Sequence, residues 1–164
     1  MSNNNSLRTA QININDEYYT LYSDVANEIL AHRHQLKGKR VHCPFSDYRH
    51  SQVVHFLVDF FHILGLAYLT ASCLDNGDGA WRFDYDGKTA TVSRLTQGGS
   101  FDTPEVTEIM HNSDVVIDNP PFSRFRAIFH WLKEAPEIHE NNMYRTHFLI
   151  YLIKVLIDGA FLPT

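Results

Sequence analysis

The chain has 164 residues, of which 44% are hydrophobic and 20% charged, and this composition indicates one globular domain with a substantial core. Its net charge of −5 and pI near 6.0 argue against an extended, nonspecific nucleic-acid surface, because such surfaces carry an excess of Lys and Arg. A local basic patch remains compatible with these values.

The cysteines and histidines indicate the compartment and argue against a metal site. Two cysteines, Cys43 and Cys73, are typical of a reduced protein, so we expect a cytoplasmic location. The ten histidines lack the spacing of known metal clips, so we predict no metal. The polar start and the charge or histidine inside both long apolar stretches, 53–69 and 148–162, predict neither a signal peptide nor a membrane span.

The first half of the chain alternates helix and strand patterns. Residues 1–14 are polar and Asn-rich, which predicts a flexible arm before a single domain at 15–164. Apolar spacing predicts a helix over 23–35, capped by Ser23 or Asp24. A strand at 40–45, a helix from Ser51 to its C-cap Gly65, and a strand at 67–74 follow.

The second half begins with a different pattern. Alternating residues over 81–94, with Asp86 and Gly87 as a two-residue turn, predict a β-hairpin. A short helix follows, with Thr103 as N-cap and Pro104 at its first position. The remaining elements are a strand at 113–118, a loop at 119–123, a helix at 124–135 with Phe125, Ile128, Phe129 and Leu132 on one face, and a strand from 146.

This order predicts an α/β fold with a doubly wound, mostly parallel sheet, incomplete and carrying an inserted hairpin. In such sheets ligands bind beyond the carboxyl ends of the strands. Residues 43–47, Asp75 and residues 118–122 lie at or just after the carboxyl ends of predicted strands, so we expect them to meet at that edge.

The Asn-Pro-Pro-Phe sequence at 119–122 provides the parts of a site for an aminated base. The Asn119 amide oxygen and the Pro120 carbonyl could each accept one hydrogen of an exocyclic amine and polarise its nitrogen. The rigid Pro120 and Pro121 would fix these acceptors in advance. The Phe122 ring could stack on a base flipped out of a duplex. A plain turn that ends a strand is the alternative.

Three segments in the same order resemble the EcoRI-type adenine-specific DNA methyltransferases. They are Asn-Asp-Glu-Tyr-Tyr-Thr at 15–20, the strand and turn at 41–51, and the segment 113–126 around Asn-Pro-Pro-Phe. The resemblance covers about 13–150. It implies a Rossmann-like methyltransferase fold, S-adenosylmethionine as cofactor, and methyl transfer to the N6 amine of adenine in double-stranded DNA.

The resemblance also suggests roles for individual residues. The catalytic set would be Asn119, Pro120, Pro121 and Phe122. Candidate cofactor-binding residues are Tyr18, Tyr19, Thr20, Cys43, Asp47, Asp75, Ser100 and Phe101. Arg124 and Arg126 could contact DNA phosphates. Each has an alternative: aromatic packing for the tyrosines, burial as a small hydrophobe for Cys43, a helix-entry acid for Asp47, a turn for Asp75, and surface exposure for the arginines.

Two departures from the family pattern bear on activity. Ser100 stands where an acid that contacts the cofactor adenine is expected, and the chain ends at Thr164, so we expect it to lack the target-recognition region. The main hypothesis is an adenine-N6 DNA methyltransferase, with the missing region supplied by a homo-oligomer or a partner chain. The alternative is a catalytically inactive relative that binds cofactor or a protein partner.

Overall fold

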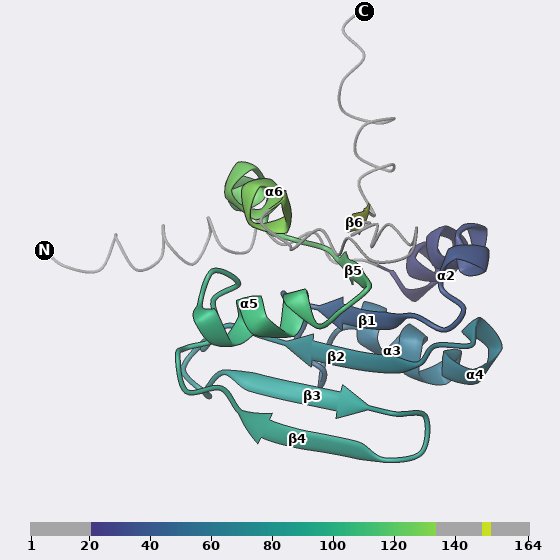
Figure 1. The fold of residues 1–164 in the computed structure, drawn as a ribbon, viewed down its shortest axis with the longest axis horizontal. Helices are drawn as coiled ribbons and strands as arrows, with labels where there is room; N and C mark the ends of the chain where they lie inside the picture. The colour runs from purple at the N-terminus through teal and green to yellow at the C-terminus, as the bar shows by residue number, and fades with distance from the viewer. Residues whose placement is uncertain (1–20, 134–148, 152–164) are drawn as a thin grey trace, which may run out of the picture.

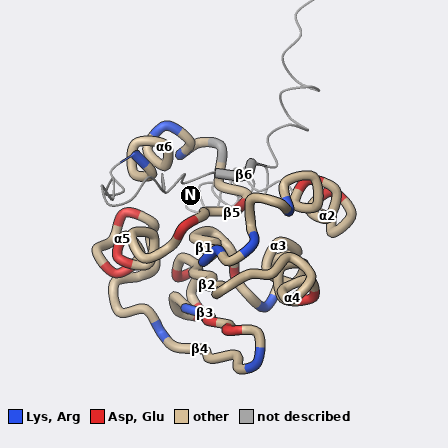
Figure 2. The backbone as a smooth tube through the Cα atoms, turned by 45° about the vertical axis from the view of Figure 1, so that its right-hand side comes forward, with Lys and Arg blue, Asp and Glu red and all other residues tan. Residues whose placement is uncertain are grey.

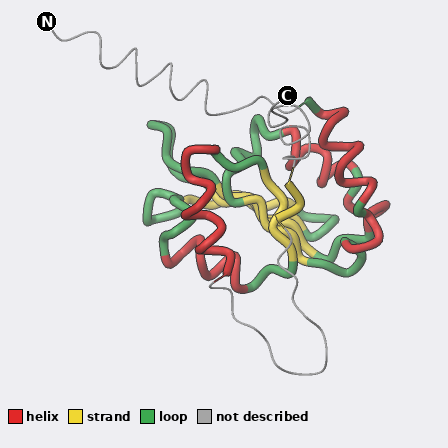
Figure 3. The backbone as a smooth tube through the Cα atoms, turned by 90° about the horizontal axis from the view of Figure 1, so that it is seen from above, coloured by secondary structure: helices red, strands yellow, loops and turns green. Residues whose placement is uncertain are grey.

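A computed structural model describes residues 21–133 and 149–151 of the chain. Over these residues a six-stranded sheet lies between two groups of helices (Figures 1 and 3). The strands are β1 (Arg40–Cys43), β2 (Tyr68–Ser72), β3 (Trp81–Tyr85), β4 (Ala90–Arg94), β5 (Val115–Asp118) and β6 (Leu149–Tyr151). The predicted mixed α/β class is confirmed.

The described chain also forms helices. They are α2 (Tyr22–Ala31), α3 (Gln52–Asp59), α4 (Phe61–Leu64), α5 (Pro104–His111) and α6 (Phe125–Lys133), with 3-10 turns η1 (Arg33–Gln35) and η2 (Phe122–Arg124). The arm expected at 1–14 lies outside the described residues. Of the strand expected from 146, residues 149–151 are described.

The sheet order is β4-β3-β2-β1-β5-β6. β2, β1, β5 and β6 are mutually parallel neighbours, with Val41 opposite both Leu69 and Val115. β3 runs antiparallel to both β2 and β4. Strands β3 and β4 therefore form an antiparallel pair at one side of the sheet (Figure 1). The exposed residues of β4 fit this outer place.

Each face of the sheet has its own apolar cluster, because side chains alternate between faces along a strand. On one face, α2, α3 and α4 pack on the strands through residues such as Ile29, Phe56 and Leu57. On the other face, α5 and α6 pack through Met110 and Ile128. The result is a helix–sheet–helix arrangement, visible from above in Figure 3.

Strand ends follow local chemistry. The strand predicted at 40–45 ends at Cys43, because Pro44 has no N–H to donate to a ladder. The strand predicted at 67–74 is Tyr68–Ser72.

The helix predicted over 51–64 begins and ends as expected but is interrupted. Ser51 is the N-cap of α3 and accepts a hydrogen bond from the Val54 amide, and Gly65 ends α4 in the left-handed region at φ 66°. Phe60 separates the two helices with φ −103° and ψ 11°. Its ring stacks on Phe56, with centroids 4.5 Å apart. Neither Gly nor Pro marks this break, so the apolar periodicity continues through it.

The hairpin turn lies one residue later than predicted. Tyr85 pairs with Ala90, and the Asp86 amide donates to the Thr89 carbonyl at 3.3 Å, so the two loop residues are Gly87 and Lys88. Asp86 is the residue before the loop, and its carboxylate stabilises the turn by accepting the amide hydrogens of Lys88 and Thr89. Gly87 takes φ 90°, which favours glycine at the first loop position.

The predicted capping of the first helix is wrong. α2 begins at Tyr22 with Leu21 as N-cap and no side-chain cap, so Ser23 and Asp24 lie inside its first turn. It also ends at Ala31, and Arg33–Gln35 form a separate 3-10 turn. By contrast, Thr103 caps α5 as expected, since its hydroxyl accepts the Val106 amide hydrogen and Pro104 follows.

These two hydroxyl residues give a matched test. Thr103→Ala is expected to lower the free energy of unfolding by about 0.5–2 kcal/mol, because a helix amide loses its acceptor. Ser23→Ala, within α2, is expected to change it by less than about 0.5 kcal/mol. Urea denaturation measures both. Equal losses in the two variants would contradict the cap assignment.

The predicted apolar face of the helix at 124–135 is partly wrong. Ile128 and Leu132 are buried as expected, but Phe125 and Phe129 are 38% and 46% exposed. Trp131 is buried in their place, and its indole N–H donates to Thr107 Oγ1 at 2.9 Å. This hydrogen bond to α5 and the contact between Trp131 and Phe101 orient α6 on the sheet.

Candidate active site

The candidate site lies at one edge of the sheet. Because β1, β2 and β5 are parallel, their carboxyl ends meet there, as predicted. β1 lies between β2 and β5, and the helices that follow β1 cover the opposite face from α5, which precedes β5. Strand order therefore reverses at β1, and ligands of open α/β sheets bind beside such a reversal.

One carboxylate joins the segments that follow β1 and β5. Asp118, the last residue of β5, is 2% exposed. Its Oδ2 accepts the Phe45 amide hydrogen at 2.5 Å, and its Oδ1 accepts the Ser46 hydroxyl at 2.7 Å and the Asn119 amide at 2.8 Å. We call residues 44–47 the β1 turn and residues 119–122 the Asn-Pro-Pro-Phe loop.

The hydrogen bonds continue from the β1 turn into helix α3. Ser51 Oγ donates to Ser46 Oγ at 2.8 Å and accepts the Val54 amide. A series of donors and acceptors thus runs from the start of α3 through Ser46 to Asp118. The helix cap and the strand end belong to one network.

Burial controls the ionisation of Asp118. Desolvation raises the pKa of this carboxyl to about 6, although its hydrogen bonds with Ser46, Phe45 and Asn119 act in the opposite direction. In an unfolded chain the pKa is near 3.8. Between these values the folded state binds the extra proton, so this group lowers stability as pH rises from about 4 to 6. Above pH 6 the carboxylate is ionised and accepts all three donors.

The Asn-Pro-Pro-Phe loop follows directly from this carboxylate. Asn119 and Pro121 are half-buried and Pro120 is buried. Phe122 begins η2, in which the Arg124 amide donates to the Pro121 carbonyl at 3.1 Å. The structure does not describe the Phe122 side chain, so its predicted stacking on a base stays a prediction.

An aromatic cluster packs against Phe45 of the β1 turn. Phe101 is 5% exposed and contacts the rings of Phe45 and Trp131, with centroids 5.8 and 5.4 Å away. The Arg124 guanidinium lies 4.9 Å above the Phe101 ring and 3.8 Å from the Asp102 carboxylate. Phe101, predicted to bind cofactor, is therefore a core residue that supports the β1 turn. Arg124 and Arg126, both predicted to contact DNA, are exposed, and one face of the Arg124 guanidinium lies against the Phe101 ring.

Ser100 does not stand alone in place of the expected acid. Its hydroxyl donates to Asp102 Oδ1 at 2.5 Å, so a carboxylate lies beside it two positions later in the sequence. Asp102 in turn pairs with Arg124.

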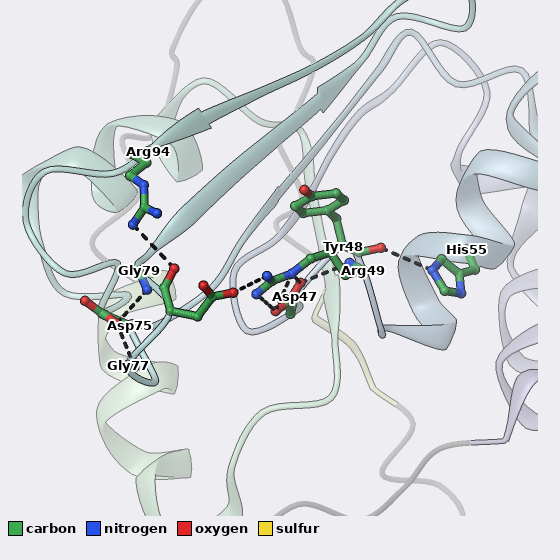
Figure 4. A network of polar contacts seen from close by, with 9 residues as sticks. Asp47, Tyr48, Arg49, His55, Asp75, Gly77, Gly79 and Arg94 are labelled. Carbon is green, nitrogen blue, oxygen red and sulfur yellow. Dashed lines mark hydrogen bonds and ion pairs between the residues drawn. The ribbon is translucent and has the colours of Figure 1, made fainter.

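An arginine connects the β1 turn to the loop after β2 (Figure 4). The Arg49 guanidinium binds Asp47 through Nε and Nη2, the latter at 2.6 Å, and binds Asp78 through Nη1. Arg49 holds the pKa of Asp47 below its ordinary value, so this carboxylate is ionised at neutral pH. Asp47, a predicted cofactor residue, is thus already part of an ion-pair network.

Asp75 organises the loop after β2. Its Oδ1 accepts the amide hydrogens of Gly77 at 2.8 Å and Gly79 at 2.9 Å (Figure 4). These hydrogen bonds lower the pKa of Asp75. At least one carboxylate oxygen of Asp75, Oδ1, therefore stabilises the turn, as the alternative interpretation expects. Its amide donates to the Gly98 carbonyl at 3.1 Å, which places residues 98–101 beside this loop.

Gly99 marks the closest approach of these two segments. A Cβ on Gly99 would lie 2.2 Å from the Cys73 carbonyl oxygen, whereas a Cβ on Gly98 would meet nothing within 4 Å. Both glycines have positive φ, 70° and 77°. Gly98→Ala is expected to cost about 1–2 kcal/mol of stability, from backbone strain alone. Gly99→Ala is expected to cost about 1–3 kcal/mol more, from overpacking.

Thermal unfolding of the two glycine variants checks this difference, because the backbone strain is common to both. Equal midpoints would show that the segments 73–75 and 98–101 are not packed together as described.

The other predicted site residues have the following places. Cys43 is fully buried on the face of the sheet that α3 covers. Burial raises the pKa of its thiol, and the nearby Asp118 carboxylate raises it further. These properties favour the interpretation of Cys43 as a small buried hydrophobic residue. Tyr18, Tyr19 and Thr20 lie outside the described residues. Sequence reasoning placed Asp118 at this edge but gave it no role, and it missed Arg49 and Asp78. A signal for Asp118 existed, because an acid at the end of an apolar strand requires buried partners.

Two further kinds of feature are absent from residues 21–133 and 149–151. No group of three or more His, Cys, Asp or Glu residues is placed to hold a metal ion there. No helix among the same residues has the length and apolar character needed to cross a membrane.

Together these features define an α/β domain whose ligand-binding edge carries an Asn-Pro-Pro-Phe loop, consistent with a methyltransferase-like fold. The family described as "Adenine-specific methyltransferase EcoRI" matches residues 6–135, and the chain belongs to this family.

Curated relatives carry related names. The type II methyltransferase M.MpnI of Mycoplasma pneumoniae is 37% identical over 112 residues, which are 68% of this chain and 35% of the relative. M.MgeORF184P of Mycoplasma genitalium is 31% identical, over 69% and 36% of the two chains. M.EcoRI of Escherichia coli is 33% identical, over 75% and 43%. The aligned region thus spans less than half of each relative. No solved structure matches.

Proposed function

We propose that this chain forms the cofactor and catalytic part of an S-adenosylmethionine-dependent methyltransferase that acts on the N6 amine of adenine in DNA. The observation that carries the proposal is the hydrogen bonding of one carboxylate, Asp118, to both the β1 turn and the Asn-Pro-Pro-Phe loop. Methyl transfer needs a donor site and an acceptor site side by side. Family membership supports the Rossmann-like reading of the sheet.

The chemistry of the sheet edge fits this cofactor. S-adenosylmethionine carries a sulfonium, an ammonium and ribose hydroxyls, all of which suit carboxylate partners. Asp47, Asp75 and Asp78 follow β1 and β2 at this edge, and lowered pKa values keep Asp47 and Asp75 ionised. When bound, the cofactor supplies an electrophilic methyl group. Asp47 and Asp75 would contact it, with Tyr18, Tyr19 and Thr20 as further walls and Ser100 beside Asp102.

The loop residues would prepare the nucleophile. The lone pair of the adenine amine is delocalised into the ring, and it becomes available when both amine hydrogens are held by acceptors. We assign these acceptors to Asn119 Oδ1 and the Pro120 carbonyl, with Pro121 limiting the backbone and Phe122 stacking on the base. Asn119 and Pro120 thereby orient the amine, and much of the catalysis is positioning.

DNA contact would come from Arg126 and from regions beyond this domain. Charges of both signs are distributed over the described helices and strands (Figure 2), and the whole chain carries −5. Such a surface provides little sequence-independent attraction to phosphates. We therefore propose that residues 15–164 form one domain and that target recognition depends on protein surface outside this domain, such as that of a second copy or of a partner chain.

A two-stage experiment tests the proposal. Calorimetric titration with S-adenosylmethionine comes first, followed by transfer of labelled methyl groups to a duplex that contains adenine. A matched duplex in which N6-methyladenine replaces adenine is the control. We expect cofactor binding and labelling of the first duplex alone. Equal labelling of both would overturn the adenine-N6 assignment, and cofactor binding without transfer would indicate the inactive alternative.

A further inference from the structure

Asp118 has no role among those proposed above for individual residues. It is the residue before Asn119, yet its side chain points to the neighbouring segment rather than to solvent, since it is 2% exposed and bonded to Phe45 and Ser46. Three donors bind its carboxylate: two backbone amides and one hydroxyl. A buried ionised carboxylate is stabilised by such a set of donors.

The three donors come from the two segments that must be placed relative to each other. Phe45 and Ser46 belong to the β1 turn, on the proposed cofactor side, and Asn119 opens the loop on the proposed adenine side. Strand pairing alone places Val41 and His42 opposite Val115 and Val116. Beyond that pairing the two backbones separate into turns, and Asp118 is the side chain that bonds to both.

We propose that Asp118 is a positioning residue, which holds the β1 turn and the Asn-Pro-Pro-Phe loop in the one relative arrangement that methyl transfer requires. It acts through Asn119 and does not touch the substrate. The inference rests on the proposed function for its catalytic consequence. The hydrogen bonds that link the two segments are independent of that function.

An asparagine at this position cannot serve the same donors. Its amide has one acceptor oxygen and one NH₂ group. If the NH₂ replaces Oδ2 it faces the Phe45 amide, and if it replaces Oδ1 it faces the Asn119 amide, so one donor always meets another donor. The shape of the side chain is retained while its function as an acceptor for both segments is lost.

Asp84 provides a matched control. It is also a buried acid, 8% exposed, and it accepts hydrogen bonds from Thr70 at 2.8 Å and from Arg82 at 2.6 Å. The register places it on the same face of the sheet as Asp118, since Asp84 pairs with Thr70, Thr70 with His42 and His42 with Val116. It lies in β3, and its hydrogen-bond partners Thr70 and Arg82 belong to neither segment. Asp84→Asn therefore reports the cost of losing a buried carboxylate elsewhere.

The test compares Asp118→Asn, Asp84→Asn and the unchanged chain by steady-state methyl transfer and by amide hydrogen exchange. In Asp118→Asn we expect kcat to fall on the order of 10- to 100-fold, as misplaced reacting groups do, with KM for cofactor and DNA changed less than about threefold. We expect exchange of the Phe45 and Asn119 amides to accelerate by about tenfold or more. Asp84→Asn should change neither kcat nor these amides.

Three outcomes overturn the inference: an unchanged kcat in Asp118→Asn, an equal fall of kcat in both variants, or unaltered exchange at Phe45 and Asn119. If the unchanged chain transfers no methyl group, the proposed function fails, and hydrogen exchange alone decides whether Asp118 links the two segments. If Asp118→Asn does not fold, Ser46→Ala replaces it, because this change removes one of the three donors. A several-fold lower kcat is then expected, and an unchanged kcat overturns the inference.

Discussion

Asn119→Ala is expected to lower kcat for methyl transfer by about 10²- to 10³-fold, the usual effect of removing one preorganised hydrogen-bonding group from an active site. The physical reason is that the adenine amine would keep only the Pro120 carbonyl as acceptor, so its lone pair would remain delocalised. Cofactor affinity should be unchanged within about twofold, because the proposed cofactor residues follow other strands. Single-turnover transfer and calorimetry measure the two quantities separately.

Two further variants make this expectation specific. Asn119→Asp retains an acceptor oxygen and should recover part of the lost rate. Asn112→Ala is the matched control, since Asn112 lies at the end of α5, before β5 rather than after it, where its side chain donates to the Glu108 carbonyl. It should leave kcat unchanged. Transfer that survives Asn119→Ala would remove the proposed mechanism.

Phe101→Ala is expected to lower the free energy of unfolding by about 3–5 kcal/mol, as large-to-small changes in a core do. The ring is 5% exposed and contacts Phe45, Trp131 and the Arg124 guanidinium, so its removal leaves a cavity beneath the site. Cofactor affinity should fall only through the looser β1 turn. Chemical denaturation with and without cofactor measures both effects.

The alternative role of Phe101 predicts the reverse pattern. A ring that mainly walls the cofactor would, on replacement by alanine, weaken cofactor binding strongly and leave the stability of the cofactor-free chain nearly unchanged. Phe101→Leu provides a control, because it retains most of the apolar volume and should recover most of the lost stability. Exposed Phe129→Ala, on α6, should cost little.

Local signals predicted those features that depend on a few neighbouring residues. Ser51 and Thr103 as N-caps, Pro104 at the start of α5 and Gly65 at the end of α4 were all predicted, because capping and positive φ are properties of single positions. Ser23 failed as a cap because α2 begins at Tyr22 and its N-cap is Leu21, two positions before Ser23. The break at Phe60 was not predicted, because no Gly or Pro marks it in the sequence.

The candidate site also has features that the sequence predicts and features that depend on tertiary contacts. The meeting of the β1 turn, Asp75 and the Asn-Pro-Pro-Phe loop at one edge follows from the alternation of strands and helices, because parallel strands align their carboxyl ends. Roles of single side chains depend on contacts between distant segments. The sequence did not reveal that the Phe101 ring lies between Phe45 and Trp131, or that the Arg124 guanidinium lies over Phe101.

By itself, the sequence determined the α/β class, the edge at which the strand ends of the candidate site meet, the order of the motifs and the family, since these depend on periodicity and on residues adjacent in the chain. Only the tertiary structure decided which side chain joins the two halves of the site. Asp118 and Phe45 are separated by 73 positions, and a hydrogen bond over that separation exists only once β1 and β5 lie side by side.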